Sequence, residues 1–120
     1  MSFCPFCDTP FYLENETCTA RLDIYPVSPG HTLVTPKRHV ETWFDMNQQE
    51  QIDAMRLVSE VKALLDKEHN PDGYNIGVNC GELAGQSVPH AHIHVMPRYK
   101  GDMEDPAGGV RGVIPEKQKY

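Results

Sequence analysis

The chain has 120 residues, 39% of them hydrophobic and 23% charged, with a formal net charge of −6. This length suits one domain with its own core, and the negative charge argues against nucleic acid as a partner, because such binding depends on cationic contacts to phosphate. No stretch approaches the ~18 apolar residues of a membrane span, and the N-terminus lacks a signal-peptide pattern. We therefore expect a cytoplasmic protein that binds neither nucleic acid nor membrane.

The N-terminal third of the sequence predicts short β-strands. Residues 11–16 and 18–27 alternate in polarity, so that Ile24 would point opposite to Asp23. A turn rich in proline and glycine follows, and residues 31–36 resume the strand pattern.

A long amphipathic helix is the clearest predicted element. Asp45 followed by Gln48 matches a capping box, with Asp45 or Asn47 as the N-cap. The sequence of residues 70–73, Asn-Pro-Asp-Gly, ends the helix. Between these signals an apolar stripe recurs at helical spacing, which we expect to lie in the core: Ile52, Met55, Leu57, Val58, Val61, Leu64 and Leu65.

The C-terminal half predicts two further strands and a tail. Residues 74–80 alternate in polarity, a glycine-containing loop spans 81–89, and residues 90–99 form the next strand. The tail after Asp102 is rich in glycine and proline and is expected to be irregular. These elements together predict an α+β domain, in which a long helix packs on one face of an antiparallel sheet.

Three of the six histidines fall on one face of the strand at 90–99. Side chains alternate along a strand, so His90, His92 and His94 share a face. Three imidazoles in an apolar core would need polar partners, which disfavours a purely structural role. They could ligate a metal ion, or one could act as a nucleophile while its neighbours orient it and manage protons. Spacing alone leaves these two interpretations open.

A Cys-x-x-Cys pair, Cys4 and Cys7, lies at the N-terminus. Such pairs occur in zinc sites and in thiol redox proteins. A redox pair would be expected at a helix N-terminus after a strand, and this pair is not, which favours half of a metal site. Cys18 and Cys80 are interpreted as lone thiols.

The sequence around the histidines resembles the signature of the histidine triad (HIT) family, His-φ-His-φ-His-φ-φ with an upstream Gly-Gln-Ser/Thr. The similarity extends to the segment from Asp23 through His39 and covers roughly residues 3 to 105. It implies a HIT-like fold with a domain at 1–105, followed by a tail at 106–120. The residues that match the signature are Gly85-Gln86-Ser87-Val88-Pro89-His90-Ala91-His92-Ile93-His94-Val95-Met96-Pro97-Arg98.

The resemblance also implies roles for individual residues. His92 would attack the α-phosphate and become a nucleotidyl-histidine, while a backbone carbonyl holds its other ring nitrogen. His94 would contact the phosphate and assist the leaving group, with His31 packed beside the triad as support. His90 completes the triad. The nucleotide would be bound by Asp23 at the ribose, Ile24 behind the base, and Asn79, Gln86 and Ser87 around the phosphates.

A structural zinc ion (Zn2+) is implied as well. Some bacterial HIT proteins pair an N-terminal Cys-x-x-Cys with two histidines, and the matching residues are Cys4, Cys7, His39 and His90. Two thiolates and two imidazoles close a tetrahedral site, so the zinc would activate no water and no catalytic metal would be required. The competing interpretation is a pair of free thiols beside a metal-free, orienting His90.

The family resemblance predicts a homodimer, joined through the long helix and an edge strand. Two interpretations of the tail stay open: it folds over the neighbouring subunit's site with Arg111 at the phosphate, or it is solvated. The predicted function is hydrolysis or transfer at the α-phosphate of AMP-containing nucleotides. Dinucleoside polyphosphates are favoured over adenosine phosphoramidates and acyl-adenylates by the stretch from Arg98 to Asp102. The alternatives are a nucleotide-binding sensor or scaffold with incidental hydrolysis, and a metal-binding protein that uses the triad as ligands.

Overall fold

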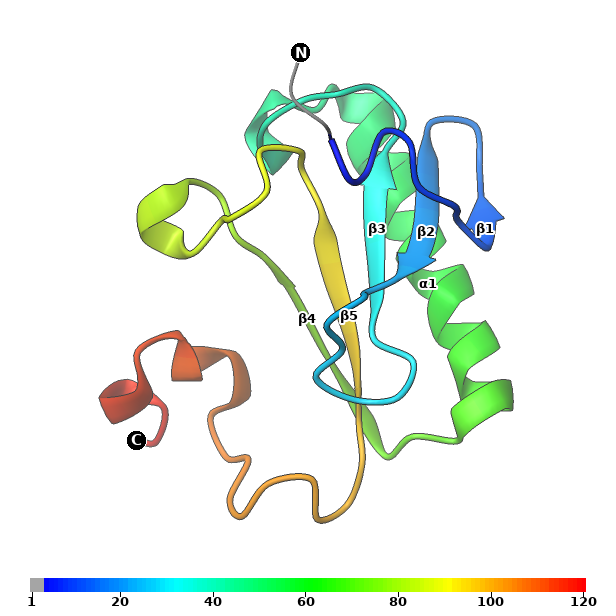
Figure 1. Ribbon diagram of the computed structural model, residues 1–120. Helices are drawn as coiled ribbons and strands as arrows, with labels where there is room; N and C mark the ends of the chain where they lie inside the picture. Colours follow the sequence, from blue (N-terminus) through cyan, green and yellow to red (C-terminus); the bar gives the residue numbers. More distant parts are fainter. Residues whose placement is uncertain (1–3) are drawn as a thin grey trace.

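The computed structural model describes residues 4–120, and residues 1–3, with which the expected domain begins, lie outside the described residues. One long helix, α1 (Gln48–His69), packs on one face of a five-stranded antiparallel sheet (Figure 1), which confirms the α+β prediction. The sheet order is β1-β2-β3-β5-β4. Its strands are β1 (Leu13–Glu14), β2 (Cys18–Leu22), β3 (Thr32–Pro36), β4 (Gly73–Val78) and β5 (Ile93–Arg98).

The ends of α1 are fixed by local hydrogen bonds. Asn47 is the N-cap: its side chain accepts from the Glu50 amide, and the Glu50 carboxylate accepts from the Asn47 amide, each at 2.8 Å. The alternative capping box starting at Asp45 is wrong, because Asp45 closes a separate 3-10 helix (Trp43–Asp45) capped by Thr42. Asn70 adopts a left-handed conformation at φ 49° and ends α1, as predicted.

The apolar stripe of α1 lies only partly in the core. Leu57, Val58 and Val61 are buried against the sheet, but Ile52 and Met55 are 40% and 43% exposed. For those two residues the core prediction is wrong, since they lie on the flank of the helix beside the Trp43 segment. The buried core is formed by Cys18, Ala20, Val34, Val40, Met46, Ala54, Leu57, Val58, Val61, Leu65, Ala91, Ile93 and Val95.

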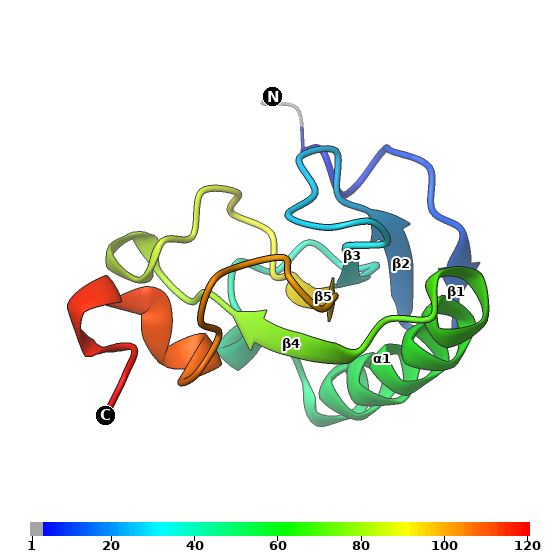
Figure 2. The ribbon, with the colours of Figure 1, turned by 90° about the horizontal axis from the view of Figure 1, so that it is seen from below.

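Strand alternation separates this core from a second, polar face of the sheet. In β5, Ile93 and Val95 belong to the core cluster, so His94 between them points to the opposite face. The same alternation directs Arg21 of β2 away from α1, because its neighbour Ala20 is in the core. In Figure 2 the N-terminal segment lies across the sheet from α1, on the polar face.

Several strands are shorter than predicted. The strand expected over 18–27 ends at Leu22, because the Asp23 side chain accepts a hydrogen bond from the Tyr25 amide at 2.9 Å and forms a turn. Ile24 is consequently outside the strand and 81% exposed. The strand expected over 90–99 begins at Ile93, after a segment in which the Ala91 amide pairs with the Val40 carbonyl.

The tail is more ordered than its composition suggested. It forms two 3-10 helices, Gly109–Val113 and Pro115–Lys117, beside β4 (Figure 2). Gly108 is required here, since a Cβ at this residue would lie 1.8 Å from the Gln118 carbonyl oxygen and its φ is 90°. Arg111 donates to the Gln118 and Lys117 carbonyls, so its guanidinium is used within the tail.

Within residues 4–120, no helix combines the length and apolar character needed to cross a membrane.

Candidate active site

His92 is oriented by the backbone of its own segment. Its Nδ1 lies 2.8 Å from the His90 carbonyl oxygen, which can only accept a hydrogen bond. Nδ1 must therefore carry the proton, and Nε2 keeps its lone pair. His92 is 6% exposed and lines a pocket on the polar face of the sheet. This is the tautomer that nucleophilic attack by Nε2 requires.

The tautomers of His31 and His94 follow from the same reasoning. The Val27 amide donates to His31 Nδ1 at 3.1 Å, so the His31 proton is on Nε2. His31 Nε2 lies 2.9 Å from His94 Nδ1 and donates to it. His94 Nδ1 thus accepts, and the remaining His94 nitrogen, Nε2, carries a proton that it can donate. The ring centroids of His92 and His94 are 5.1 Å apart, and both residues line the same pocket.

His31 and His94 are neutral near pH 7. Burial, followed by the charges of His92 and His31, lowers the pKa of His94 to about 4. Burial also lowers the pKa of His31, with Asp23 acting in the opposite direction from 3.5 Å. A neutral His94 pairs with the protonated Nε2 of His31 without repulsion, so burial and hydrogen bonding favour the same state.

We expect these depressed pKa values to make stability depend on pH. Unfolded histidine binds a proton near pH 6.5, whereas folded His94 does so only near pH 4. Between these values the unfolded chain binds more protons, so the free energy of unfolding should fall as pH drops from 7 to 5, by about 1 kcal/mol after allowing for solvent screening. Denaturant unfolding at several pH values measures this. The His94→Asn variant should show a shallower pH dependence and the exposed His69→Asn control the wild-type one; equal slopes in all three would contradict the assignment.

The pocket beside His92 and His94 brings together four of the five predicted nucleotide-binding residues. Asp23, Ile24, Asn79 and Ser87 all line it, although they come from three separate segments. Its remaining walls are mainly apolar and include Leu22, Tyr25, Leu33 and Val88. An apolar pocket with a few convergent polar groups is the usual form of a small-molecule site.

Gln86, the fifth predicted residue, is used inside the loop instead. Its amide nitrogen donates to the Glu41 and Val88 carbonyls, at 2.6 and 3.0 Å, and its side-chain oxygen accepts from the Gly81 amide at 2.8 Å. These bonds fix the loop before β5 and hence the neighbouring Ser87. Gln86 does not line the pocket in this structure.

Several pocket residues were not predicted from the sequence, among them Phe6 and Arg21. Phe6 stands edge-on to His92, with ring centroids 5.0 Å apart, and Arg21 reaches the pocket from β2. Phe6 lies between Cys4 and Cys7, and a Cys-x-x-Cys pattern predicts a role only for its two thiols. The sequence feature that could have indicated Phe6 is its position in a segment that a metal ion would bring to the triad.

The Cys-x-x-Cys pair meets two histidines at the other side of the triad. The ligand atoms of Cys4, Cys7, His39 and His90 all lie within 4.8 Å of one another. Sulfur-to-Nδ1 distances are 3.4 Å from Cys4 to His90 and 3.3 Å from Cys7 to His39, and the two Nδ1 atoms are 3.1 Å apart. Tetrahedral zinc with two sulfur and two nitrogen ligands would separate these atoms by about 3.3–3.8 Å. The four residues therefore fit a zinc ion.

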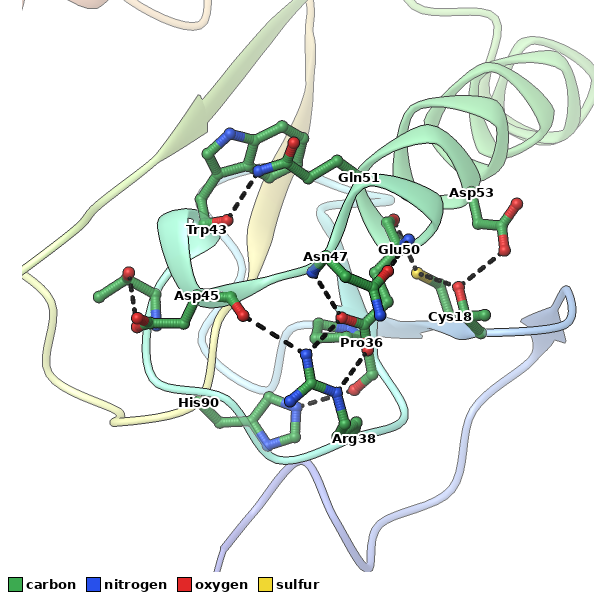
Figure 3. Close-up of polar contacts among 12 residues, drawn as sticks. Cys18, Pro36, Arg38, Trp43, Asp45, Asn47, Glu50, Gln51, Asp53 and His90 are labelled. Carbon is green, nitrogen blue, oxygen red and sulfur yellow. Dashed lines mark hydrogen bonds and ion pairs between the residues drawn. The ribbon is translucent and has the colours of Figure 1, made fainter.

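The surroundings of this cluster also suit a metal. His90 is fully buried, and its Nε2 donates to the Pro36 carbonyl at 2.9 Å, which leaves the Nδ1 lone pair for a metal. Arg38, next to His39, donates to both carboxylate oxygens of the buried Glu50 at 3.1 and 2.7 Å (Figure 3). The loop carrying His39 is thus fixed to the start of α1.

A second group of ligand-type atoms, from Asp23, His31 and His94, does not suit a metal. His31 Nδ1 faces the Val27 amide hydrogen, so its Nε2 must keep a proton and cannot offer a lone pair. In residues 4–120 the three triad histidines do not form a ligand group by themselves. The alternative of a metal held by the triad therefore has no support in this geometry.

The segment from His90 to His94 joins the cysteine–histidine cluster to the apolar pocket, and this arrangement defines the class of the domain. The HIT domain model matches residues 7–101, and the chain belongs to the histidine triad family. It is 45% identical over 91 residues to an uncharacterized HIT-like protein of Methanocaldococcus jannaschii, covering 76% of this chain and 70% of that protein.

Two further relatives bear on function. The bis(5'-adenosyl)-triphosphatase of Dictyostelium discoideum is 35% identical over 94 residues, covering 78% of this chain and 63% of the enzyme. A zinc-bound histidine triad family protein from Mycobacterium smegmatis superimposes with a TM-score of 0.71 at 37% identity, covering 85% of this chain and 79% of that protein.

Proposed function

We propose that this protein is a nucleotide hydrolase or transferase that cleaves AMP-containing nucleotides at the α-phosphate. The observation that carries the proposal is the tautomer of His92: Nδ1 donates to the His90 carbonyl, and Nε2 keeps its lone pair beside a pocket lined by Asp23 and Ser87. Because the hydrogen bond already holds His92 in one orientation, the reaction has no further entropic cost for orienting the nucleophile.

In the proposed first step, His92 Nε2 attacks the α-phosphorus and forms a phosphorus–nitrogen bond. The bond from phosphorus to the leaving group breaks, and the leaving group departs as an anion while His94 Nε2 donates a hydrogen bond to its oxygen. Water then attacks the phosphorus of the nucleotidyl-histidine and loses one proton to the solvent. The phosphorus–nitrogen bond breaks, which releases the nucleoside monophosphate and restores the lone pair of His92 Nε2. Positioning and charge stabilisation account for most of the catalysis in phosphoryl-type transfers.

The pocket residues supply that positioning. The Asp23 carboxylate can accept hydrogen bonds from both hydroxyls of a ribose, and Ile24 offers an apolar surface to the base. Ser87 and Asn79 are donors for the phosphate oxygens, and Gln86 supports them by fixing the loop. We propose dinucleoside polyphosphates as substrates, ahead of phosphoramidates, because a relative carrying this domain is a bis(5'-adenosyl)-triphosphatase.

Trapping the covalent intermediate tests the proposal. The protein is mixed with diadenosine polyphosphate labelled at the α-phosphorus, quenched, and digested, and the label is located by mass spectrometry. Label on His92 is the expected result. Nucleotide binding without trapped label or turnover would favour a sensor or scaffold instead of an enzyme.

We further propose that zinc occupies the Cys4, Cys7, His39 and His90 cluster. The ligand set and the zinc-bound relative support this identity. All four positions of a tetrahedron would be filled by protein, so the ion would supply rigidity and no activated water. Its consequence for His92 is indirect, because the His90 backbone carbonyl accepts the His92 hydrogen bond.

A homodimer is the proposed assembly. Ile52 and Met55 are exposed on α1 and share a surface groove with Trp43. The edge strand β4 presents Ile76, which is 47% exposed. Both features match the helix and edge strand through which HIT proteins are expected to associate, and a tail beside β4 could then reach a neighbouring subunit.

We expect Met55→Glu to weaken that dimer by at least about 100-fold in dissociation constant. An unpaired carboxylate buried in an apolar interface costs several kcal/mol. Sedimentation equilibrium measures the change, with Lys67→Glu at the exposed end of α1 as the control. A wild-type monomer, or a variant that dimerises like the wild type, would refute this interface.

A further inference from the structure

Arg21 is a buried cation at the edge of the pocket. It is 5% exposed, and within residues 4–120 no carboxylate forms an ion pair with it. Its Nη2 donates to the Thr19 hydroxyl at 2.8 Å and reaches the Thr35 hydroxyl at 3.5 Å. Its Nη1 donates to the carbonyl and hydroxyl oxygens of Thr9.

Burial of the Arg21 guanidinium lowers the stability of the fold, which is not expected of a side chain that only fills space. Burying a guanidinium whose hydrogen-bond partners are all neutral costs free energy, and the Arg21 Nε has no hydrogen-bond partner at all. An apolar side chain would occupy the same volume without that cost. The guanidinium is therefore best explained by the parts of the fold that it connects. It binds β2 and β3 through Thr19 and Thr35, and it binds the N-terminal segment through Thr9.

The N-terminal segment is also the wall of the pocket. Phe6 and Thr9 both line the pocket, and the Phe6 ring lies 5.0 Å from the His92 ring, centroid to centroid. The Arg21 Cζ is 5.7 Å from the Phe6 centroid, within cation–π range. The metal cluster would hold this segment at Cys4 and Cys7, and Arg21 holds it from the other side, at Thr9.

We propose that Arg21 is a positioning residue for the nucleotide pocket. It acts through the N-terminal segment, keeping Phe6 against His92 and the pocket closed on that side. The inference rests on the proposed function, because it assigns the pocket to a nucleotide. His92 itself is oriented separately by the His90 carbonyl, so loss of Arg21 should change nucleotide affinity more than the rate of the chemical step.

A double-mutant cycle tests whether Arg21 acts through Phe6. The dissociation constant of AMP is measured by calorimetry for the wild type, Arg21→Met, Phe6→Ala and the double variant. Each single variant should bind AMP about tenfold more weakly. The double variant should also bind AMP about tenfold more weakly than the wild type. Once the Phe6 ring has been removed, loss of Arg21 has no ring left to displace. In the hydrolysis assay, each of these variants should show a KM about tenfold higher than the wild type, and its kcat should stay within about threefold of the wild-type value.

Other outcomes separate the two proposals. A roughly 100-fold loss in the double variant would mean independent contributions and overturn the role of Arg21, as would an unchanged affinity in Arg21→Met. A wild-type protein that binds no AMP would instead overturn the proposed function and this inference with it. Lys67→Met, at the exposed end of α1, is the cation control and should bind AMP normally.

Thr9→Val keeps the test decisive if Arg21→Met does not fold. It removes the hydroxyl that accepts from Arg21 and also donates to the Pro5 carbonyl, and it leaves the Thr9 carbonyl as an acceptor for Arg21. AMP affinity should fall by about threefold, and this loss should disappear in the Phe6→Ala background. Persistence of the loss without Phe6 would contradict the proposal.

Discussion

Replacement of His92 by asparagine is expected to lower turnover of a dinucleoside polyphosphate by about 10⁴-fold or more, as found when a catalytic nucleophile is removed. The asparagine amide can still donate to the His90 carbonyl, so the loop should keep its shape. The variant lacks the Nε2 lone pair that attacks phosphorus. AMP affinity should change by no more than about threefold, because the lost interaction belongs to the transition state. Steady-state kinetics and calorimetry on the same samples measure both quantities.

His94→Asn is the matched control for this prediction. It should lose about 10²–10³-fold in turnover, as expected when a hydrogen-bond donor to the developing negative charge is removed, and the loss should shrink when the leaving group is a better one that needs less stabilisation. His92→Asn should remain inactive with every leaving group. Unchanged turnover in His92→Asn would refute the nucleophile assignment, and equal rescue of both variants would refute the division of roles between the two histidines.

The histidine face could be predicted because strand alternation is a strong constraint. Ile93 and Val95 of β5 must enter the core, so His94 cannot. His90 and His92 precede β5, and the hydrogen bond from His92 to a backbone carbonyl was implied by the family resemblance. The grouping of Cys4 and Cys7 with His39 and His90 came from family resemblance, since these residues are up to 86 positions apart and no local pattern links them.

Other features depend on tertiary contacts that the local sequence does not encode. Ile52 and Met55 have the spacing of core residues, but they lie on the flank of α1 beside Trp43, where both stay exposed. Gln86 has the polarity of a phosphate ligand, yet the nearby Glu41 and Val88 carbonyls use its donors. Arg21 looks like an ordinary strand cation, and only the fold over it shows that it is buried.

Metal removal is expected to have the second large effect. If free zinc exceeds its dissociation constant by about 1,000-fold, binding stabilises the folded state by about 4 kcal/mol. For a domain of this size that corresponds to a fall in Tm of about 10–20 °C after chelation. Cys4→Ser should show the same loss without chelator, together with loss of stoichiometric metal by elemental analysis. Cys80→Ser is the control, because Cys80 lies outside the cluster.

The same experiment distinguishes the possible ligands. Metal retained in Cys4→Ser but lost in His92→Asn would assign the ion to the triad and refute the four-residue site. The expected pattern is the reverse, because His92 Nδ1 is bound to the His90 carbonyl whereas His90 Nδ1 faces the thiols. Since His90 contributes its ring to the metal and its carbonyl to His92, chelation should also reduce turnover, even though the zinc contacts no substrate.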